Sequence, residues 1–535
     1  MKFIPHSPRP RKSPRLSLCN LEDRATPATA VYSAVTQTLT VTAATGDRLI
    51  VDAVTASNKP TGYITVIESQ ASVTVFNSDN TNQGVRNLVV KFGNGNTGDF
   101  VLGSTTVLGG NLTIAGAKAT QTVALFGTVG GNVVYTAAPG PMPGTLGTAS
   151  DEINLEPTTV IGGNLTLGLG SGTNTVRLKG GTVRGGLTIA GGAGADRVEI
   201  TASADLVVGA SAAFNLGDGN NTVLGIATRQ MRVGGAFTYT GGVGNDTFDL
   251  DASGAGLSVG TDARFTLGTP LGFDSNTAAF EFLSAGRNIT FIGGAGADNI
   301  ETSGILSAGV NLTAVLGNGA NVLDSNLLGS GTNVIGGSFT YTGGMGADTV
   351  TVDNTTIGRN VSVALGEAVG GSNSFFGTGT KGPGPVTVYG NLKVTDGSGA
   401  SGIFLQRLYV GGGLTVLGGA GADNVIVDDA QVAGPALFDM GAGIDSVHIE
   451  QTLSNGGGPL TGATTFGGTF TFRGGDGNDG VFLTEDNSAS LKIDFGGKVV
   501  LVGGAGTDQL VLKNGASFEL TGNTDDFEVH NANLP

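Results

Sequence analysis

The amino-acid sequence predicts an all-β protein that winds as a parallel β-helix solenoid, with about 25 residues in each coil. First, the pattern Gly-Gly-x-Gly-x-Asp, followed by alternating apolar residues, recurs along the chain. Second, weaker copies that end in Asn lie between the Asp copies, and successive turn residues are 22 to 30 positions apart between Asn174 and Asn373. Third, 95 of the 535 residues are Gly without a collagen-type triplet, which favours turns and strands over long helices.

Each coil is predicted to contain a strand, a glycine turn, a second strand and a variable loop. Residues 236–239 (Ala-Phe-Thr-Tyr) precede one such turn, and residues 349–352 (Thr-Val-Thr-Val) follow another. This alternation at period two is typical of a strand with one buried face. Glycine suits the turns because they need positive φ. Asn and Asp are the next most suitable residues there, because their side chains form hydrogen bonds with the local backbone. We expect the Asn and Asp corners to form a vertical file.

The sequence predicts three segments without an internal linker. Residues 1–30 form a basic, Pro-rich segment for targeting, or a disordered tail. Residues 31–514 form the solenoid, whose glycine-rich and β-branched texture is uniform. Residues 515–535 depart from the repeat and are predicted to cap the last coil, which an open sheet edge needs.

Composition and charge exclude several classes of protein. The net charge is −16 although the first residues are basic, so the acidic body should not bind nucleic acid. Cys19 is the only cysteine and the three histidines are scattered, which excludes a disulfide framework and a thiolate metal site. No stretch approaches the ~18 apolar residues of a transmembrane span.

Residues 21–28 have the sequence Leu-Glu-Asp-Arg-Ala-Thr-Pro-Ala. They resemble a short segment near the start of many large secreted or surface proteins of planctomycete-type bacteria. The apolar run of an ordinary signal peptide is missing, because residues 16–19 are too short for one. The resemblance implies a secreted or cell-surface protein, with cell-surface or extracellular matrix components as partners.

The turn motif resembles the glycine-aspartate nonapeptide of haemolysin-type (RTX) calcium-binding proteins, most closely at residues 474–482. The resemblance implies that Asp carboxylates and turn carbonyls of neighbouring coils bind Ca²⁺, which takes six to eight oxygen ligands. The ligands that it implies are Asp196, Asp246, Asp298, Asp348, Asp423, Asp445, Asp476, Asp479 and Asp508.

The repeat departs from that family, in which the nonapeptides follow one another directly. Here single copies are separated by a whole coil, and up to Asn373 the Asp turns alternate with Asn turns. Asn between Asp relieves like-charge repulsion in a stack, so turn chemistry without metal is the alternative interpretation. Calcium is more strongly favoured from Asp423 onward, where few Asn residues intervene.

Two classes of function follow from these observations. The first is a secreted or cell-surface structural or adhesive solenoid that is not an enzyme and has no catalytic residues. The alternative is a carbohydrate-active β-helix enzyme, a polysaccharide lyase or hydrolase, which would need clustered carboxylates beside a cation or base. A deep groove with convergent charged groups would favour the enzyme, and a smooth face covered by Thr, Ser and Asn the structural role. Candidate acids outside the turns are Asp151, Glu152, Glu199, Asp249, Asp251, Glu281, Asp428, Asp429 and Glu485.

Overall fold

The protein is described by a computed structural model that covers most of the chain. It describes residues 28–450, 462–512, 527 and 529–532, apart from gaps at 44–47, 54–61, 70–72, 82–83, 94–96, 117–118, 138–149, 202–203, 227–229, 252–255, 270–274, 326–330, 370, 379–383 and 484–492. The predicted targeting segment up to residue 27 and most of the predicted cap lie outside the described residues.

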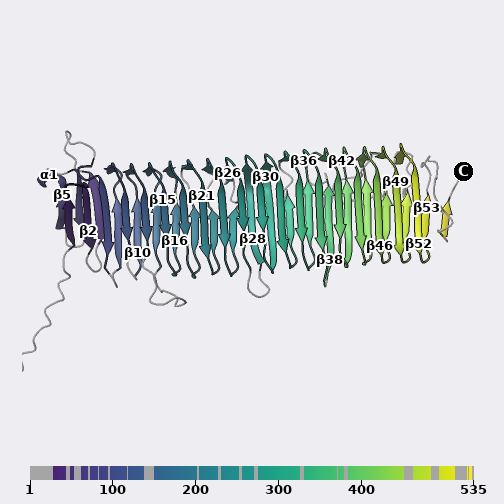
Figure 1. Cartoon of the computed structure of the whole chain (residues 1–535), viewed down its shortest axis with the longest axis horizontal. Helices are drawn as coiled ribbons and strands as arrows, with labels where there is room; N and C mark the ends of the chain where they lie inside the picture. The colour runs from purple at the N-terminus through teal and green to yellow at the C-terminus, as the bar shows by residue number, and fades with distance from the viewer. Residues whose placement is uncertain are drawn as a thin grey trace, which may run out of the picture.

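The described strands stack along one long rod and cross its axis (Figure 1). A regular coil contributes β15 (Leu165–Gly168) to one sheet, and then β16 (Thr175–Leu178) and β17 (Gly181–Val183) to a second sheet. The next coil begins with β18 (Leu187–Ala190), which pairs with β15 in parallel, residue by residue. The predicted all-β parallel solenoid of about 25 residues per coil is therefore confirmed.

The first sheet has 19 strands and the second has 35. The first sheet consists of β1 (Thr29–Ser33), β2 (Thr38–Ala43), β6 (Asn87–Phe92), β9 (Leu112–Ala115), β12 (Val133–Thr136), β15, β18, β21 (Ala212–Gly217), β24 (Phe237–Gly241), β27 (Ala263–Thr266), β29 (Ile289–Ile292), β31 (Leu312–Gly317), β34 (Phe339–Gly343), β37 (Val361–Gly366), β40 (Leu392–Asp396), β43 (Leu414–Gly419), β46 (Ala436–Ala442), β49 (Phe470–Asp476) and β52 (Val499–Ala505).

The second sheet contains two parallel rows. Its first row consists of β3 (Arg48–Ala53), β7 (Gly98–Leu102), β10 (Gln121–Leu125), β13 (Glu152–Leu155), β16, β19 (Arg197–Ile200), β22 (Thr222–Gly225), β25 (Thr247–Leu250), β28 (Ser275–Ala285), β30 (Ala297–Ala308), β32 (Val322–Ser325), β35 (Thr349–Asp353), β38 (Ser372–Thr378), β41 (Ala400–Gln406), β44 (Asp423–Asp428), β47 (Ser446–Ile449), β50 (Gly480–Leu483), β53 (Gln509–Leu512) and β54 (Val529–Ala532). Its second row consists of β8 (Val107–Leu108), β11 (Thr128–Val129), β14 (Val160–Ile161), β17, β20 (Leu206–Val208), β23 (Gln230–Val233), β26 (Gly256–Val259), β33 (Asn333–Ile335), β36 (Thr355–Ile357), β39 (Val386–Val388), β42 (Leu408–Val410), β45 (Gln431–Val432), β48 (Thr464–Phe466) and β51 (Ile493–Phe495).

The second row lies where the sequence analysis expected only a variable loop. Its strands are two to four residues long, so they contain too few alternating positions to produce a recognisable period. The long strands β28 and β30 run through both rows and join them into one sheet.

A single apolar core runs inside the stacked coils. Inward residues alternate with outward ones along each strand, as in β24, where Phe237 and Tyr239 are buried and Thr238 and Thr240 are half-buried. Phe214, Phe237 and Phe265 of successive coils pack with ring centroids 5.3 and 5.6 Å apart. Such contacts let each coil bury its apolar face against its neighbours.

The N-terminal end of the rod is closed by antiparallel strands. β1 pairs antiparallel with β2, and β4 (Ile64–Glu68) lies antiparallel between β3 and β5 (Val73–Asn77). This end therefore differs from the uniform parallel repeat expected over 31–514, and it covers the edge of the first coil. At the other end β54 pairs in parallel with β53.

The one helix among the described residues is α1 (Ser78–Thr81), which has four residues. No described helix has the length and the apolar character that crossing a membrane requires.

Candidate metal centre

The predicted vertical file of polar corners is present between the first sheet and the first row of the second. We call it the turn file. Its members occupy equivalent positions in successive coils, and each side chain is buried. They are Gln121, Asp151, Asn174, Asp196, Asn221, Asp246, Asn276, Asp298, Asn321, Asp348, Asn373, Ser401, Asp423, Asp445, Asp479 and Asp508.

Hydrogen bonds link the members of the turn file from Gln121 to Asp479 to the next coil. The backbone N–H of Asp196 donates to Oδ1 of Asn221 at 3.0 Å, and the N–H of Asn221 donates to Oδ1 of Asp246 at 3.0 Å. Oδ2 of Asp196 accepts a hydrogen bond from the N–H of Gly192 in its own turn at 3.3 Å. These carboxylates therefore satisfy buried backbone donors at the corners.

The glycines of the motif are explained by the space beside this file. A Cβ on Gly191 would overlap with Oδ2 of Asp196, and a Cβ on Gly194 would overlap with the carbonyl oxygen of Gly172 in the preceding coil. Only glycine permits such close approach of one coil to the next.

Burial changes the acidity of the alternating part of the file. It raises the pKa of Asp246 and Asp348 to about 7 and that of Asp196 and Asp298 to about 6. Hydrogen bonds from the neighbouring Asn residues act in the opposite direction, because they favour the ionised carboxylate.

The C-terminal part of the file stacks four carboxylates without an intervening amide. The N–H of Asp423 donates to Asp445 at 2.7 Å, that of Asp445 to Asp479 at 2.9 Å, and that of Asp479 to Asp508 at 2.9 Å. Burial raises the pKa of Asp445 to about 7. The hydrogen bond from the backbone N–H of Asp423 opposes this increase, and the charges of Asp423 and Asp479 add to it. Oδ2 of Asp445 and Oδ2 of Asp479 have no hydrogen-bond donor among the described residues.

Eight of the nine implied calcium ligands belong to the turn file. The ninth, Asp476, is exposed and lies outside it. Asp151, which the sequence analysis placed outside the turns, belongs to the file: it accepts hydrogen bonds from Gln121 at 3.0 Å and from Tyr135 at 2.7 Å. Calcium binding by the turns stays a prediction.

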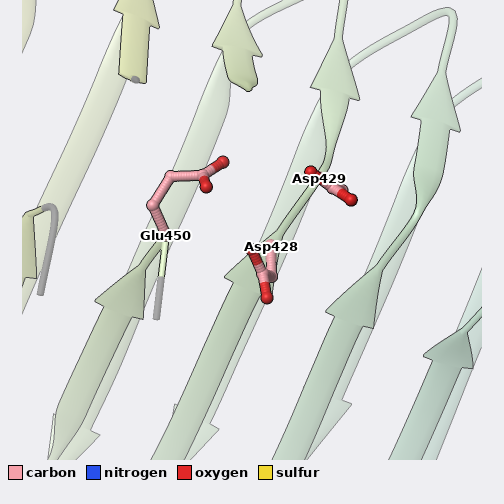
Figure 2. Close-up of side chains that lie close together, drawn as sticks. All are labelled: Asp428, Asp429 and Glu450. Carbon is pink, nitrogen blue, oxygen red and sulfur yellow. The ribbon is translucent and has the colours of Figure 1, made fainter. Parts of the chain in front are cut away.

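A second group of carboxylates meets at a different corner, between the two rows of the second sheet. Asp428 ends β44, Asp429 follows it, and Glu450 comes directly after β47 (Figure 2). One carboxylate oxygen from each lies within 4.8 Å of the others. Asp428 is 1% and Glu450 0% exposed, whereas Asp429 is half-buried. We call these three residues the acidic cluster.

Ionisation of the acidic cluster is unfavourable in its buried surroundings. Burial, and then the charges of Glu450 and Asp429, raise the pKa of Asp428 to about 8. Burial also raises the pKa of Glu450 and that of Asp429. Oδ2 of Asp428 has no hydrogen-bond donor among the described residues. The hydroxyl and N–H of Thr464 and the N–H of Asp429 lie beside the carboxylate of Glu450 and act to lower its pKa, against the effect of burial.

Gln406 lies one coil before Asp428 and is paired with it in register. Its side chain is 1% exposed, and neither atom of its amide group has a hydrogen-bond partner among the described residues. The sequence pattern predicts Asp428 and Asp429 as candidate acids, but it does not predict Gln406 or Glu450. Glu450 follows Asp428 by 22 residues, the spacing between Asp423 and Asp445, so extending the repeat from the acidic pair would have found it.

A hollow of about 320 Å³ adjoins the acidic cluster. Arg407, Tyr409, Asp429 and Gly462 are among the residues that line it. Asp429 therefore belongs to both the cluster and the hollow, while Asp428 and Glu450 lie behind it, out of contact with solvent.

The remaining candidate acids form no comparable group among the described residues. Glu152 and Glu199 both form ion pairs with Arg177, the second at 2.8 Å. Oδ1 of Asp249 accepts from the N–H of Asp251 at 2.9 Å. Glu485 lies outside the described residues.

Comparison of the chain with known proteins finds no matching family model, no matching curated protein and no matching solved structure.

Proposed function

We propose that this chain is a secreted or cell-surface structural or adhesive rod, and not an enzyme. The observation that carries the proposal is a file of small hydroxyl side chains on the outer face of the first sheet. We call it the threonine file. Its members occupy equivalent positions, interrupted only by Val134, Ala213, Arg264, Lys393 and Leu437. They are Thr113, Thr166, Thr188, Thr238, Thr290, Thr313, Thr340, Ser362, Thr415 and Thr471.

This face suits contact with an extended partner. Neighbouring strands lie roughly 4.8 Å apart, so the hydroxyls repeat at that step along the rod. Few charges interrupt them, and hydroxyl groups can donate and accept hydrogen bonds with polymers or with other polar surfaces. We therefore propose cell-surface or extracellular matrix components as partners.

Two further features support the proposal. The resemblance of residues 21–28 to a segment of secreted and surface proteins supports export. The acidic stack from Asp423 to Asp508, with its raised carboxylate pKa values, supports stabilisation by calcium, together with the turns of the alternating stretch.

The location is tested by fractionating cells that produce the native chain. The proposal expects the protein in the medium, or on intact cells where added protease can degrade it. Recovery only in the protease-protected soluble fraction would overturn it. Adhesion is tested with Thr238→Lys, Thr290→Lys and Thr340→Lys combined, which should weaken binding to isolated envelope material, and Thr65→Lys, outside the threonine file, is the control.

A carbohydrate-active enzyme remains the second candidate. The observation that favours it is the hollow where Arg407 and Tyr409 adjoin Asp429. Burial of Asp428 and Glu450 opposes it, because acid–base catalysis requires contact with the substrate. Release of oligosaccharides from a polysaccharide panel, abolished by Asp429→Asn, would favour the enzyme over the rod.

A further inference from the structure

We propose that the acidic cluster, together with Gln406, is a binding site for one divalent cation of the calcium class. Asp428, Asp429 and Glu450 supply carboxylates and Gln406 supplies its side-chain carbonyl oxygen. This site is separate from the turn file, and it does not depend on the proposed role of the rod.

Three carboxyl groups converge at a corner between the two rows of the second sheet. Three carboxylate oxygens lie within 4.8 Å of one another, and two of the three side chains are fully buried. Arg407 and Asp429 attract each other, but no ion pair at or below 4.0 Å joins a described cation to any of the three carboxylates. Buried charges are ordinarily paired or bound to a metal, and in the described part of the chain no cation lies within ion-pair distance of this group.

A neutral side chain beside the acidic cluster also lacks partners in the described part of the chain. Gln406 is as buried as Asp428 and aligned with it, and its amide has no hydrogen-bond partner among the described residues. Buried polar side chains are ordinarily hydrogen-bonded, and a buried amide without partners indicates a ligand that is not part of the chain.

The donor set defines the class of cation. All four groups offer oxygen, and neither sulfur nor imidazole is among them, which disfavours zinc and copper. Three carboxylates and an amide oxygen can supply the six to eight oxygens that Ca²⁺ takes, with some carboxylates bidentate. The half-buried Asp429 beside the hollow gives the cation a route from solvent and leaves room for water ligands.

The acidic cluster and the turn file can be tested separately because β44 lies between them. Asp423 is at the start of this strand and Asp428 at its end. Five residue steps at roughly 3.3 Å put the two corners about 16 Å apart.

The test is equilibrium dialysis of the full chain against ⁴⁵Ca²⁺ at pH 7.5. The wild type should bind one more Ca²⁺ per chain than the combined variant Asp428→Asn and Glu450→Gln. The matched control, Asp445→Asn with Asp479→Asn, removes the same number of carboxylates from the turn file and should keep this extra ion. Equal binding by the wild type and the cluster variant, or no binding by the wild type, would overturn the proposal.

Melting curves exclude a trivial loss of structure. In a chelator the cluster variant should melt at or above the temperature of the wild type, because it no longer buries unpaired carboxylates. If the cluster variant melts at a lower temperature than the wild type in chelator, Asp429→Asn alone is tested in its place. This variant alters only the half-buried ligand and should weaken binding of the same ion at least tenfold. Unchanged affinity in Asp429→Asn would then contradict the site.

Discussion

The amide Nδ2 of Asn174 donates a hydrogen bond of 2.7 Å to Oδ1 of Asp196 in the next coil, and the backbone N–H of Asn174 donates to the same oxygen at 3.1 Å. The amides of Asn276 and Asn321 donate in the same way to Asp298 and Asp348, whereas that of Asn221 donates to carbonyl oxygens of its own turn. Each amide accompanies a buried carboxylate that would otherwise face another carboxylate.

Asn174→Asp should destabilise the protein by about 2–4 kcal/mol at pH 8, because it removes a donor and buries a new carboxylate beside Asp196 and Asp151. Melting temperature followed by circular dichroism measures the effect. The same change at the exposed Asn220 is the control, since its oxygen accepts from the N–H of Asn245 and a carboxylate can do so as well. Equal effects at the two sites would contradict the pairing.

Asp445→Asn should stabilise the protein in chelator at pH 8 by about 1–2 kcal/mol. It removes one of four stacked carboxylates, and the new amide nitrogen can take the place of Oδ2, which has no donor among the described residues. Asp298→Asn is the matched control and should destabilise, because there Oδ2 accepts the N–H of Gly294 at 3.2 Å. A lower melting temperature for Asp445→Asn would refute this account of the acidic run.

Stability in chelator should fall as the pH rises from about 4 to about 7. Burial raises the pKa of Asp246, Asp348 and Asp445 to about 7, while unfolded Asp titrates near pH 4. Between these values the folded state holds more protons than the unfolded state, so the free energy of unfolding decreases with rising pH. Melting temperatures from pH 5 to pH 8 measure the slope. Asp445→Asn should flatten it, whereas the same change at the exposed Asp476 should not.

Adding Ca²⁺ to chelated protein should raise its melting temperature if the turns are ligands, since a cation that binds only the folded state stabilises it. The measurement is made in the Asp428→Asn and Glu450→Gln background, so that only the turn file contributes. An unchanged melting curve at millimolar calcium would leave the turns as hydrogen-bonded corners without metal.

Gly419→Ala should destabilise the protein by several kcal/mol, because its Cβ would overlap with the carbonyl oxygen of Gly397 in the preceding coil. Gly109→Ala is the control, since a Cβ there meets nothing within 4 Å. Urea midpoints of the two variants measure the contrast. Similar midpoints would show that the coils can move apart at low cost.

Much of the fold could be predicted from local pattern. The spacing from Asn174 to Asp196 and onward predicts stacked corners, and the register between β15 and β18 confirms the coil length. The antiparallel end formed by β1, β4 and β5 could not be predicted, because strand direction depends on partners distant in sequence. The short second-row strands could not be predicted because two to four residues contain no measurable period.

The sequence by itself determined the solenoid, its coil length and the file of Asn and Asp, because each depends on a residue pattern that repeats at a fixed interval. Only the tertiary structure decided which carboxylates lack partners and which are shielded. Asp428, Asp429 and Glu450 become one group because coil stacking brings them together. Stacking also removes water from Asp428 and Glu450, and burial is a property of the surroundings rather than of the residues.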